Sequence, residues 1–228
     1  MTREEEISAN LQEVEQRISI AATEAGRNRN EIELIVVTKN FPLSDAQILY
    51  ALGARAFGEN RDQEGALKSE QLPGDVIWHF QGQIQGRKIK SIASWADSVH
   101  SLDSLDHARK FAGCDESKVR NFFIQVNLEP LRADRGGVST DYLAPLLEGI
   151  ISETEIAPLG LMTVAPTTME PARAFAQMRE IFDRARLSVP TLTALSMGMS
   201  GDFEAAIASG ATHLRIGSSI LGSRGLPA

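Results

Sequence analysis

The sequence predicts an α/β fold: a single (β/α)8 barrel of the TIM type that carries an additional N-terminal amphipathic helix. Two observations lead to this prediction. Eight short apolar runs alternate with helical segments at a spacing of roughly 25 residues, which is typical of a parallel sheet. These units occupy the chain from Ile32 to Gly217, and eight such units indicate a closed barrel. An open doubly wound sheet is the alternative, but no G-x-G-x-x-G fingerprint follows the first run.

The predicted strands are rich in β-branched and aromatic residues, and most of them end in polar groups. They span residues 32–40, 54–60, 76–82, 98–103, 121–128, 156–164, 191–198 and 211–217. Apolar periodicity and capping residues predict the intervening helices. These helices lie near 43–52, 84–95, 104–112, 142–151, 170–187 and 202–209, and a further charged helix precedes Pro73.

The N-terminal segment repeats apolar residues at the spacing of one helical face. Ile7, Leu11, Val14, Ile18 and Ala21 follow one another at intervals of four, three, four and three residues. A lone amphipathic helix has to bury its apolar face. We therefore expect residues 1–26 to pack on a barrel formed by residues 32–222, within one domain that spans the chain, 1–228.

Composition and charge exclude several classes of partner. The chain has 228 residues, a formal net charge of −7 and no cluster of Lys and Arg that would bind nucleic acid. The acidic balance also argues against a membrane surface as a partner. The one cysteine, Cys114, excludes an internal disulfide and a multi-cysteine metal site. The N-terminus lacks the apolar segment of a secretory signal, so we expect a reduced, cytoplasmic protein.

The carboxyl ends of the strands are where barrels of this type carry their active sites. Seven of the eight predicted strands end in a polar or functional side chain. These side chains are Lys39, Glu59 with Asn60, His79, Asn127, Met162 with Thr163, Ser196 and Arg215. Each alone is typical of a solvated strand end, whereas their convergence predicts a functional site at one face of the barrel.

Lys39, at the end of the first predicted strand, allows two interpretations. Its stem could lie along the edge of the core while the ammonium group reaches water. Alternatively, the amine lies at the mouth of a pocket, where partial desolvation favours the neutral form that can attack a carbonyl.

The loops after the last two predicted strands are rich in Ser and Gly. One runs from Ser196 to Asp202, and the other from Gly217 to Gly222. Barrels often bind phosphate at this place, through backbone N–H groups and the N-terminus of a short helix. Turn formation and helix capping would need the same residue types. The occurrence of two such loops at the two expected positions favours phosphate binding.

A ligand that carries both a phosphate and an aldehyde would bridge these loops and Lys39, and pyridoxal 5'-phosphate fits this description. Lys39 would form a Schiff base with it, and Arg215 could face the pyridine nitrogen. Because an arginine stays protonated, the nitrogen would stay unprotonated, which disfavours transamination chemistry. A barrel enzyme that binds a phosphorylated sugar through Lys39 is a further alternative.

The sequence also resembles a known family through motifs that occur in order along the whole chain. These motifs are Val36-Val37-Thr38-Lys39, Phe57-Gly58-Glu59-Asn60 followed by Gln63-Glu64, Trp78-His79-Phe80-Gln81-Gly82, Gly160-Leu161-Met162, Leu195-Ser196-Met197-Gly198-Met199-Ser200 and Arg215-Ile216-Gly217-Ser218-Ser219-Ile220-Leu221-Gly222. They are similar to those of the YggS/PROSC family of pyridoxal phosphate homeostasis proteins.

The resemblance implies a barrel similar to the N-terminal domain of alanine racemases, with pyridoxal 5'-phosphate bound as a covalent aldimine on Lys39. It also implies a ring contact from Arg215 and no accepted catalytic reaction. Phosphate contacts are implied for Met199, Ser200, Gly217 and Ser218. We add Asn60, from the second motif, to the expected cofactor-binding residues, and we expect neither a catalytic residue nor a metal.

The sequence departs from the family pattern at two positions. Arg87 stands where Asn is common, and Arg135 precedes Gly136-Gly137 where a Lys is usual. The roles of both positions therefore stay open, whereas the assignment of Lys39 does not depend on them.

A racemase needs a base on each face of the cofactor ring, and Lys39 could serve only one face. Alanine racemases supply the other with a tyrosine from an additional domain, whereas Tyr50 and Tyr142 of this chain are expected on helices away from the mouth. His79 is the best internal substitute, although its flanking aromatic residues favour a structural role. We therefore expect a monomeric carrier that lacks efficient catalysis and hands the cofactor to apo enzymes. A racemase-like enzyme dependent on pyridoxal phosphate is the alternative.

Overall fold

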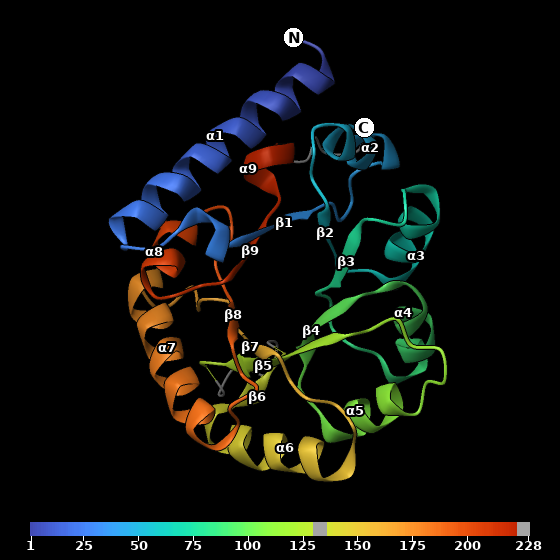
Figure 1. Cartoon of the computed structure of the whole chain (residues 1–228), viewed down its shortest axis with the longest axis vertical. Coiled ribbons are helices and arrows are strands. Elements are labelled where there is room, and N and C mark those ends of the chain that lie inside the picture. The colour runs from blue at the N-terminus through green and yellow to red at the C-terminus, as the bar shows by residue number, and fades with distance from the viewer. Residues whose placement is uncertain (130–135, 223–228) are drawn as a thin grey trace.

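The computed structural model of the protein shows a closed barrel of parallel strands surrounded by helices (Figure 1). It describes residues 1–129 and 136–222. Neighbouring strands follow the order β4-β3-β2-β1-β9-β8-β7-β5, and the pairing of β4 with β5 closes the ring. The predicted fold class, a TIM barrel with an added N-terminal helix, is therefore confirmed, and the open doubly wound sheet is wrong.

The barrel strands are short and run parallel throughout. They are β1 (Glu33–Val37), β2 (Ala56–Glu59), β3 (Ile77–Phe80), β4 (Ser98–Leu102), β5 (Asn121–Asn127), β7 (Gly160–Met162), β8 (Ala194–Ser196) and β9 (His213–Ile216). Each lies within a predicted strand. One short strand was not predicted: β6 (Val138–Ser139) pairs with the end of β5.

Helices follow the strands and cover the outside of the barrel (Figure 1). They are α2 (Leu43–Ala51), α3 (Asp62–Gln71), α4 (Ile89–Trp95), α5 (Leu105–Ala112), α6 (Thr140–Glu153), α7 (Pro171–Ser188), α8 (Phe203–Ala208) and α9 (Ser218–Leu221). Two 3-10 turns, η1 (Arg29–Glu31) and η2 (Gly86–Lys88), precede β1 and α4. Within the described residues, no helix combines the length and the apolar character needed to cross a membrane.

Side chains alternate between the two faces of each strand, as the period of a β-strand requires. Residues such as Val36, Trp78 and Leu214 face outward and join the main core between strands and helices. Their neighbours face the interior of the barrel, where Phe123 and Met162 belong to a separate, smaller apolar cluster. The barrel therefore has an outer core between strands and helices. Its interior contains a separate set of side chains.

Helix α1 (Arg3–Glu24) lies outside the barrel against α8 and α9 (Figure 1). A capping box starts it: Thr2 Oγ1 accepts the Glu5 N–H, and Glu5 Oε2 accepts the Thr2 N–H. The predicted apolar face is largely buried, since Ile7 and Ile18 are fully inaccessible. The buried face of α1 therefore packs against α8 and α9.

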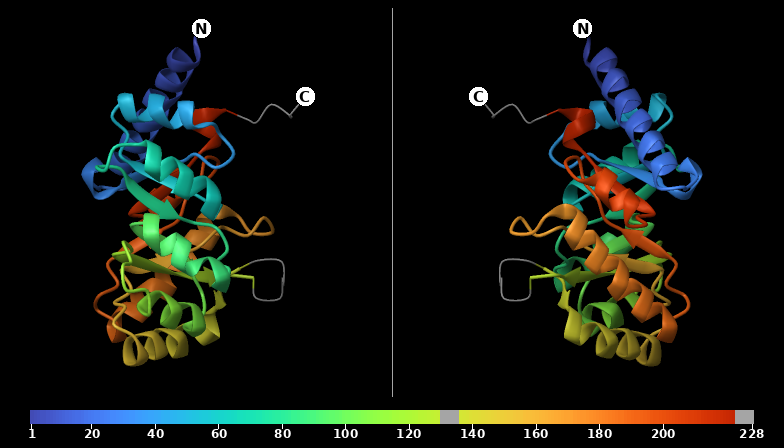
Figure 2. Two further views of the ribbon diagram at one scale, coloured as in Figure 1. Left: turned by 90° about the vertical axis from the view of Figure 1, so that its right-hand side faces the viewer. Right: turned by 90° about the vertical axis from the view of Figure 1, so that its left-hand side faces the viewer.

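The two ends of the barrel differ in what surrounds them (Figure 2). The loops that follow the strands, including the projecting segment between β7 and α7, lie on one side of the molecule. We call this side the mouth. The opposite side, where β1 begins at Glu33 and β9 begins at His213, is called the base.

Candidate functional site at the barrel mouth

A pocket of about 630 Å³ opens at the mouth, and all seven residues expected to bind the cofactor line it. These residues are Lys39, Asn60, Met199, Ser200, Arg215, Gly217 and Ser218. They come from the ends of β1, β2, β8 and β9, so the parallel arrangement of the strands brings them together. A depression of similar volume lies between α6 and α7, but its walls are largely apolar helix surface away from the strand ends.

Two supports fix the backbone on either side of Lys39. Before it, the Thr38 carbonyl accepts a hydrogen bond from Lys68 Nζ at 2.8 Å, and Thr38 Oγ1 donates to Glu59 Oε1 at 2.6 Å. After it, Asn40 adopts a left-handed conformation with φ of 62°, and its N–H donates to Glu64 Oε2 at 2.7 Å. The position of Lys39 is therefore set by β2 and α3, through contacts that the sequence does not reveal.

Glu59 and Lys68 form a buried ion pair beneath this segment, with Lys68 Nζ 2.6 Å from Glu59 Oε1. Both side chains are almost inaccessible to water. Burial raises the pKa of Glu59, and this effect outweighs the opposing contacts from Lys68 and Thr38. Glu59, which the sequence places at the mouth, is thus directed into the wall between β2 and α3 instead.

The two Ser/Gly loops touch each other at the mouth. The Ser219 N–H donates to Ser200 Oγ at 3.2 Å, and the Met199 N–H donates to Asp202 Oδ1 at 2.6 Å. In the described part of the chain, the N–H groups of Ser200, Gly201, Gly217 and Ser218 have no hydrogen-bond acceptor. Such a group of unpaired backbone donors at the pocket wall is typical of an anion site.

Gly217 is required by close packing at this position. A Cβ atom there would lie 2.9 Å from the Val37 carbonyl oxygen, which belongs to the neighbouring strand and cannot move easily. The absence of a side chain lets the loop after β9 lie against the end of β1, so that Gly217 and Lys39 line the same pocket.

Arg215 forms the floor of the pocket and is 5% exposed. Its Nη1 donates to Ser196 Oγ at 2.7 Å, and its Nη2 donates to the Thr163 carbonyl at 2.8 Å. Burial lowers the pKa of Arg215 to about 10, with Asp202 opposing the shift. The guanidinium group therefore stays protonated at neutral pH and can only donate hydrogen bonds.

Other strand-end residues lie elsewhere than the sequence suggests. His79 is 2% exposed, faces the barrel interior and contacts His100. Ser196 also lies inside, behind Arg215. Asn127 and Thr163 are buried; Thr163 Oγ1 donates to the Val126 carbonyl, and Asn127 Oδ1 accepts the Glu129 N–H. Of the strand-end residues, Lys39, Asn60, Met162 and Arg215 line the mouth pocket, whereas Glu59, His79 and Ser196 do not.

Two further polar residues of the pocket were not predicted, namely Gln81 and Gln125. Gln81 follows β3 directly, and Gln125 is two residues beyond Phe123 on the inward face of β5. Strand alternation could have identified Gln125. Arg87 lines a smaller pocket of about 310 Å³ that adjoins Asn60, whereas Arg135 lies outside the described residues.

Tyr50 and Tyr142 do not line the pocket. Tyr50 donates to Asp75 Oδ1 at 2.9 Å on the surface, and Tyr142 is exposed on α6. Neither tyrosine is therefore placed to act as a second base at this site.

Comparison with known proteins agrees with this class of fold and site. The family model described as alanine racemase, N-terminal domain, matches residues 9–225. The pyridoxal phosphate homeostasis protein of Mycobacterium tuberculosis is 36% identical over 246 residues, covering 98% of this chain and 95% of the relative. The protein of the same description from Escherichia coli is 33% identical, covering 96% and 97% of the two chains. The structure of PipY from Synechococcus elongatus with pyridoxal phosphate bound is 30% identical, with a TM-score of 0.79 and coverage of 95% and 100%.

The fold and the matched model define a barrel of the alanine racemase N-terminal-domain class. Within this class, the chain belongs to the family of pyridoxal phosphate homeostasis proteins, because relatives of that description match it over nearly their full length.

Proposed function

We propose that the protein binds pyridoxal 5'-phosphate at the mouth pocket, as a Schiff base on Lys39, and takes part in the homeostasis of this cofactor. The observation that supports the proposal best is the placement of three different groups in one pocket: an amine, a set of unpaired backbone donors and a buried guanidinium. They suit the aldehyde, the phosphate and the ring nitrogen of the cofactor, respectively. The relatives' description and the cofactor-bound PipY structure agree with this proposal.

In this proposal Ser200, Gly217 and Ser218 hold the phosphate, and Met199 makes a further contact with it. Arg215 donates to the ring nitrogen and keeps it unprotonated, and Asn60 contacts the cofactor from β2. When bound, the cofactor supplies an electrophilic aldehyde, which the amine of Lys39 captures. No metal is required by this chemistry.

We further propose that the protein holds and releases the cofactor as a monomer, without efficient catalysis, and passes it to apo enzymes. A racemase requires a second acid or base on the opposite face of the ring. Within the described residues, His79 is directed into the barrel and neither tyrosine lines the pocket. The racemase-like alternative therefore has no residue in this part of the chain for its second base.

Replacement of Lys39 tests the binding proposal. The purified wild-type protein should show the absorbance of a Schiff base, and borohydride should fix the cofactor to the peptide that contains Lys39. The Lys39→Arg variant keeps a positive charge but cannot form this bond, so its absorbance should be that of the free aldehyde. Lys90→Ala, which removes an exposed lysine of α4, is the matched control and should behave like the wild type. A colourless wild-type protein that ignores added cofactor would contradict the proposal.

The racemase-like alternative is tested by a chiral assay of amino acids with cofactor-loaded protein. We expect no stereoinversion at ordinary enzymatic rates. Rapid inversion that is abolished in Lys39→Arg would establish an enzyme instead of a carrier.

A further inference from the structure

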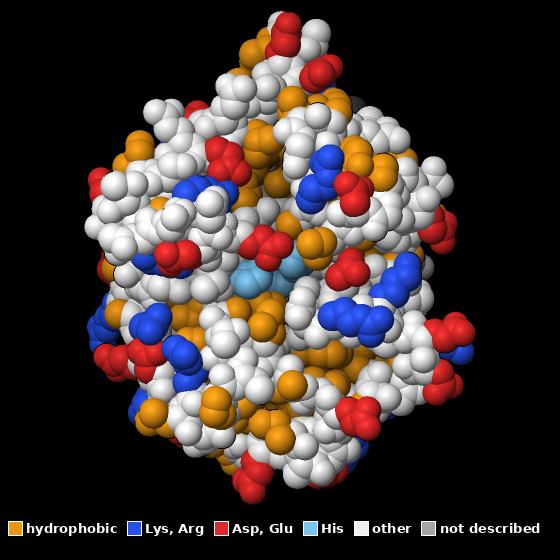
Figure 3. All heavy atoms as spheres, in the orientation of Figure 1, with side chains coloured by type: hydrophobic (Ala, Val, Ile, Leu, Met, Phe, Trp, Pro, Cys, Tyr) orange, Lys and Arg blue, Asp and Glu red, His pale blue; other side chains and the backbone are white. Residues whose placement is uncertain are grey.

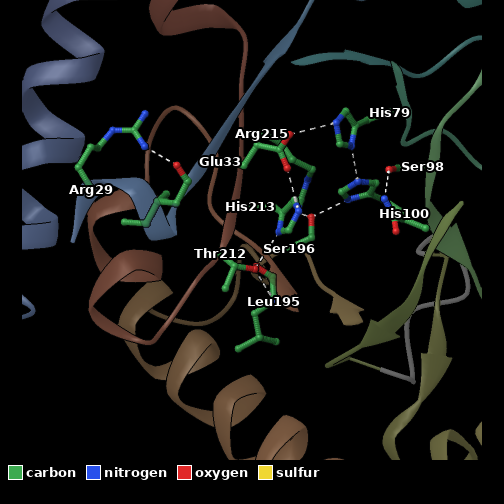
Figure 4. Close-up of polar contacts among 12 residues, drawn as sticks. Arg29, Glu33, His79, Ser98, His100, Leu195, Ser196, Thr212, His213 and Arg215 are labelled. Atoms are coloured by element: carbon green, nitrogen blue, oxygen red, sulfur yellow. Dashed lines mark hydrogen bonds and ion pairs between the residues drawn. The ribbon is translucent and has the colours of Figure 1, made fainter. Parts of the chain in front are cut away.

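The interior of the barrel contains a connected set of polar side chains, of which the proposed cofactor contacts use only Arg215 (Figure 4). Barrels of this type are usually filled by layers of branched aliphatic residues. Here the inward-facing positions include Glu33, His79, His100, His213 and Arg215, grouped around Phe123. The ring of His100 stacks on Phe123, with ring centroids 4.2 Å apart.

Four contacts join the mouth to the base through this interior. Arg215 Nη1 donates to Ser196 Oγ at 2.7 Å, and Ser196 Oγ lies 2.8 Å from His100 Nδ1. His100 Nε2 lies 2.9 Å from His79 Nδ1. His79 Nε2 then lies 3.6 Å from Glu33 Oε1, and the other oxygen of Glu33 lies 2.9 Å from His213 Nε2.

Water reaches this set of residues from the base. Ser196 and His100 are fully buried, and His79 is nearly so. The side chain of Glu33, by contrast, is 33% exposed. Figure 3 shows histidine side chains and an adjacent acidic side chain in the hollow at the centre of this face. Buried polar groups therefore link the base to the mouth pocket.

The hydrogen-bond partners fix the direction of the three hydrogen bonds that run from Arg215 to His79. Arg215 can only donate, so Ser196 Oγ accepts from it. In the described part of the chain the Ser196 hydroxyl contacts only Arg215 and His100, so its own hydrogen must go to His100 Nδ1. The reverse arrangement would leave a buried hydroxyl hydrogen unpaired, which is costly. Because its Nδ1 accepts, a neutral His100 carries its hydrogen on Nε2 and donates to His79 Nδ1.

The same reasoning extends to the base. His79, which accepts at Nδ1, carries its hydrogen on Nε2. This atom lies 3.6 Å from the Glu33 carboxylate, a charge contact that is too long for a hydrogen bond. Burial lowers the pKa of His100 well below its ordinary value, with the nearby His79, His213 and Arg215 adding to the effect. Burial raises the pKa of Glu33, but the contacts from His213 and His79 outweigh it and hold the pKa well below its usual range. These pKa shifts keep His100 neutral and Glu33 ionised, as the bond directions given above require.

We propose that His79, His100 and Ser196 form a hydrogen-bond relay with a single direction, oriented by the nearby charge of Glu33, and that this relay positions Arg215 at the cofactor ring. The inference rests on the proposed function, because it assigns the relay to the residue that contacts the ring nitrogen. In the described residues Arg215 has no ion-pair partner. The aligned bonds compensate for its lost hydration and point toward the negative charge of Glu33, which lies 3.6 Å from His79 Nε2. Glu33 and the two histidines are positioning residues, since none of them lines the pocket.

Histidine tautomers test the relay directly, in the wild-type chain without cofactor. Long-range ¹H–¹⁵N NMR at neutral pH should show His79 and His100 as neutral rings protonated at Nε2. A ring protonated at Nδ1 at either position would overturn the proposal. Because no variant and no cofactor are involved, this measurement decides the relay even if the proposed function is wrong.

Binding of pyridoxal 5'-phosphate tests the coupling of the relay to the pocket. Glu33→Gln replaces one acceptor oxygen with a donor and removes the charge, so the relay loses its fixed direction. We expect it to weaken cofactor binding about three- to tenfold, the effect of weakening one buried hydrogen bond to Arg215. The midpoint of the pH-dependent change in the absorbance of the bound cofactor should also differ from that of the wild type. Glu31→Gln, which removes an exposed charge at the base that pairs with Arg27, should change binding less than about 1.5-fold.

A double-variant cycle separates the relay from independent effects. Ser196→Ala removes the acceptor for Arg215, and the Glu33→Gln change should then have no further effect on cofactor binding. The coupling would be overturned if the effects of Ser196→Ala and Glu33→Gln on cofactor binding were additive. Equal cofactor binding by the Glu33→Gln and Glu31→Gln variants would also overturn it. Failure of the wild type to bind the cofactor would instead contradict the proposed function, and the tautomer measurement would still stand.

Discussion

The amine of Lys39 owes its position to residues that do not touch the pocket. Lys68 contacts both the Thr38 carbonyl and the Glu59 carboxylate, at 2.8 and 2.6 Å. Buried pairs of this kind cost much hydration, so they stabilise a protein only while both partners are present. Their value here is geometric, because they fix the residue before Lys39 against α3.

Replacement of Lys68 by Met should show this dependence. The Lys68→Met variant leaves the Glu59 charge buried without a partner, and the free energy of unfolding should fall by about 3–5 kcal/mol. Denaturant unfolding measures the change. Lys110→Met, which removes a lysine from an exposed pair with Asp106, is the matched control and should be nearly neutral. Equal effects of the two variants would show that the buried pair does not support the β2–α3 wall.

At the scale of secondary-structure elements, α1 supports the part of the barrel that carries the Ser/Gly loops. Arg17 pairs with Glu204 of α8 at 2.6 Å, and Asn10 donates to the Ile220 carbonyl of α9 at 3.0 Å. Arg3 donates to the Leu221 carbonyl at the end of α9. Because α9 has only four residues, these contacts from another helix hold it in place.

The apolar face of α1 gives a clear pair of variants. Ile18 is fully buried, so Ile18→Ala should lower the free energy of unfolding by about 2–5 kcal/mol and also weaken cofactor binding through α8 and α9. Ile20, on the same helix, is 51% exposed, and Ile20→Ala should change neither quantity appreciably. Thermal unfolding and cofactor titration measure both effects. An Ile18→Ala variant as stable as Ile20→Ala would indicate that α1 is dispensable.

At the scale of the whole molecule, the polar interior makes stability depend on pH. The pKa of His100 is lowered by burial, from an ordinary value of 6.5. Above this pH both the folded and the unfolded chain carry a neutral imidazole at this position. Below it, the unfolded chain takes up a proton that the folded chain cannot, so stability is lost as the pH falls. Burial raises the pKa of Glu59 and Asp202, which act in the opposite direction.

A comparison of two proteins isolates the contribution of His100. The loss of unfolding free energy between pH 7.5 and pH 5 should be larger in the wild type than in His100→Gln. The difference should approach about 1.4 kcal/mol for each pH unit below the ordinary pKa. Glu59 and Asp202 are present in both proteins, so their contributions cancel. Identical pH profiles would mean that His100 is protonated in the folded protein.

Much of the candidate site followed from the sequence, because a strand that ends in a functional group has a known place in a barrel. Lys39, Arg215 and the Ser/Gly loops were placed in this way, and the structure gathers them in one pocket. His79 was misplaced at the mouth, since its neighbours Trp78 and Phe80 do not reveal how far along the barrel axis it lies. That depends on the register of β3 with β4, which is set by packing of the whole ring.

The sequence by itself determined the number and order of the barrel units, the buried face of α1 and the residues at the strand ends, because these depend on local apolar patterns. Closure through β4 and β5 and the buried pair beneath Lys39 were decided only by the tertiary structure. The same holds for the approach of His79 to His100 and of Glu33 to His213. Each of these joins residues of two different elements, whose distance depends on strand register and on the packing of the elements together.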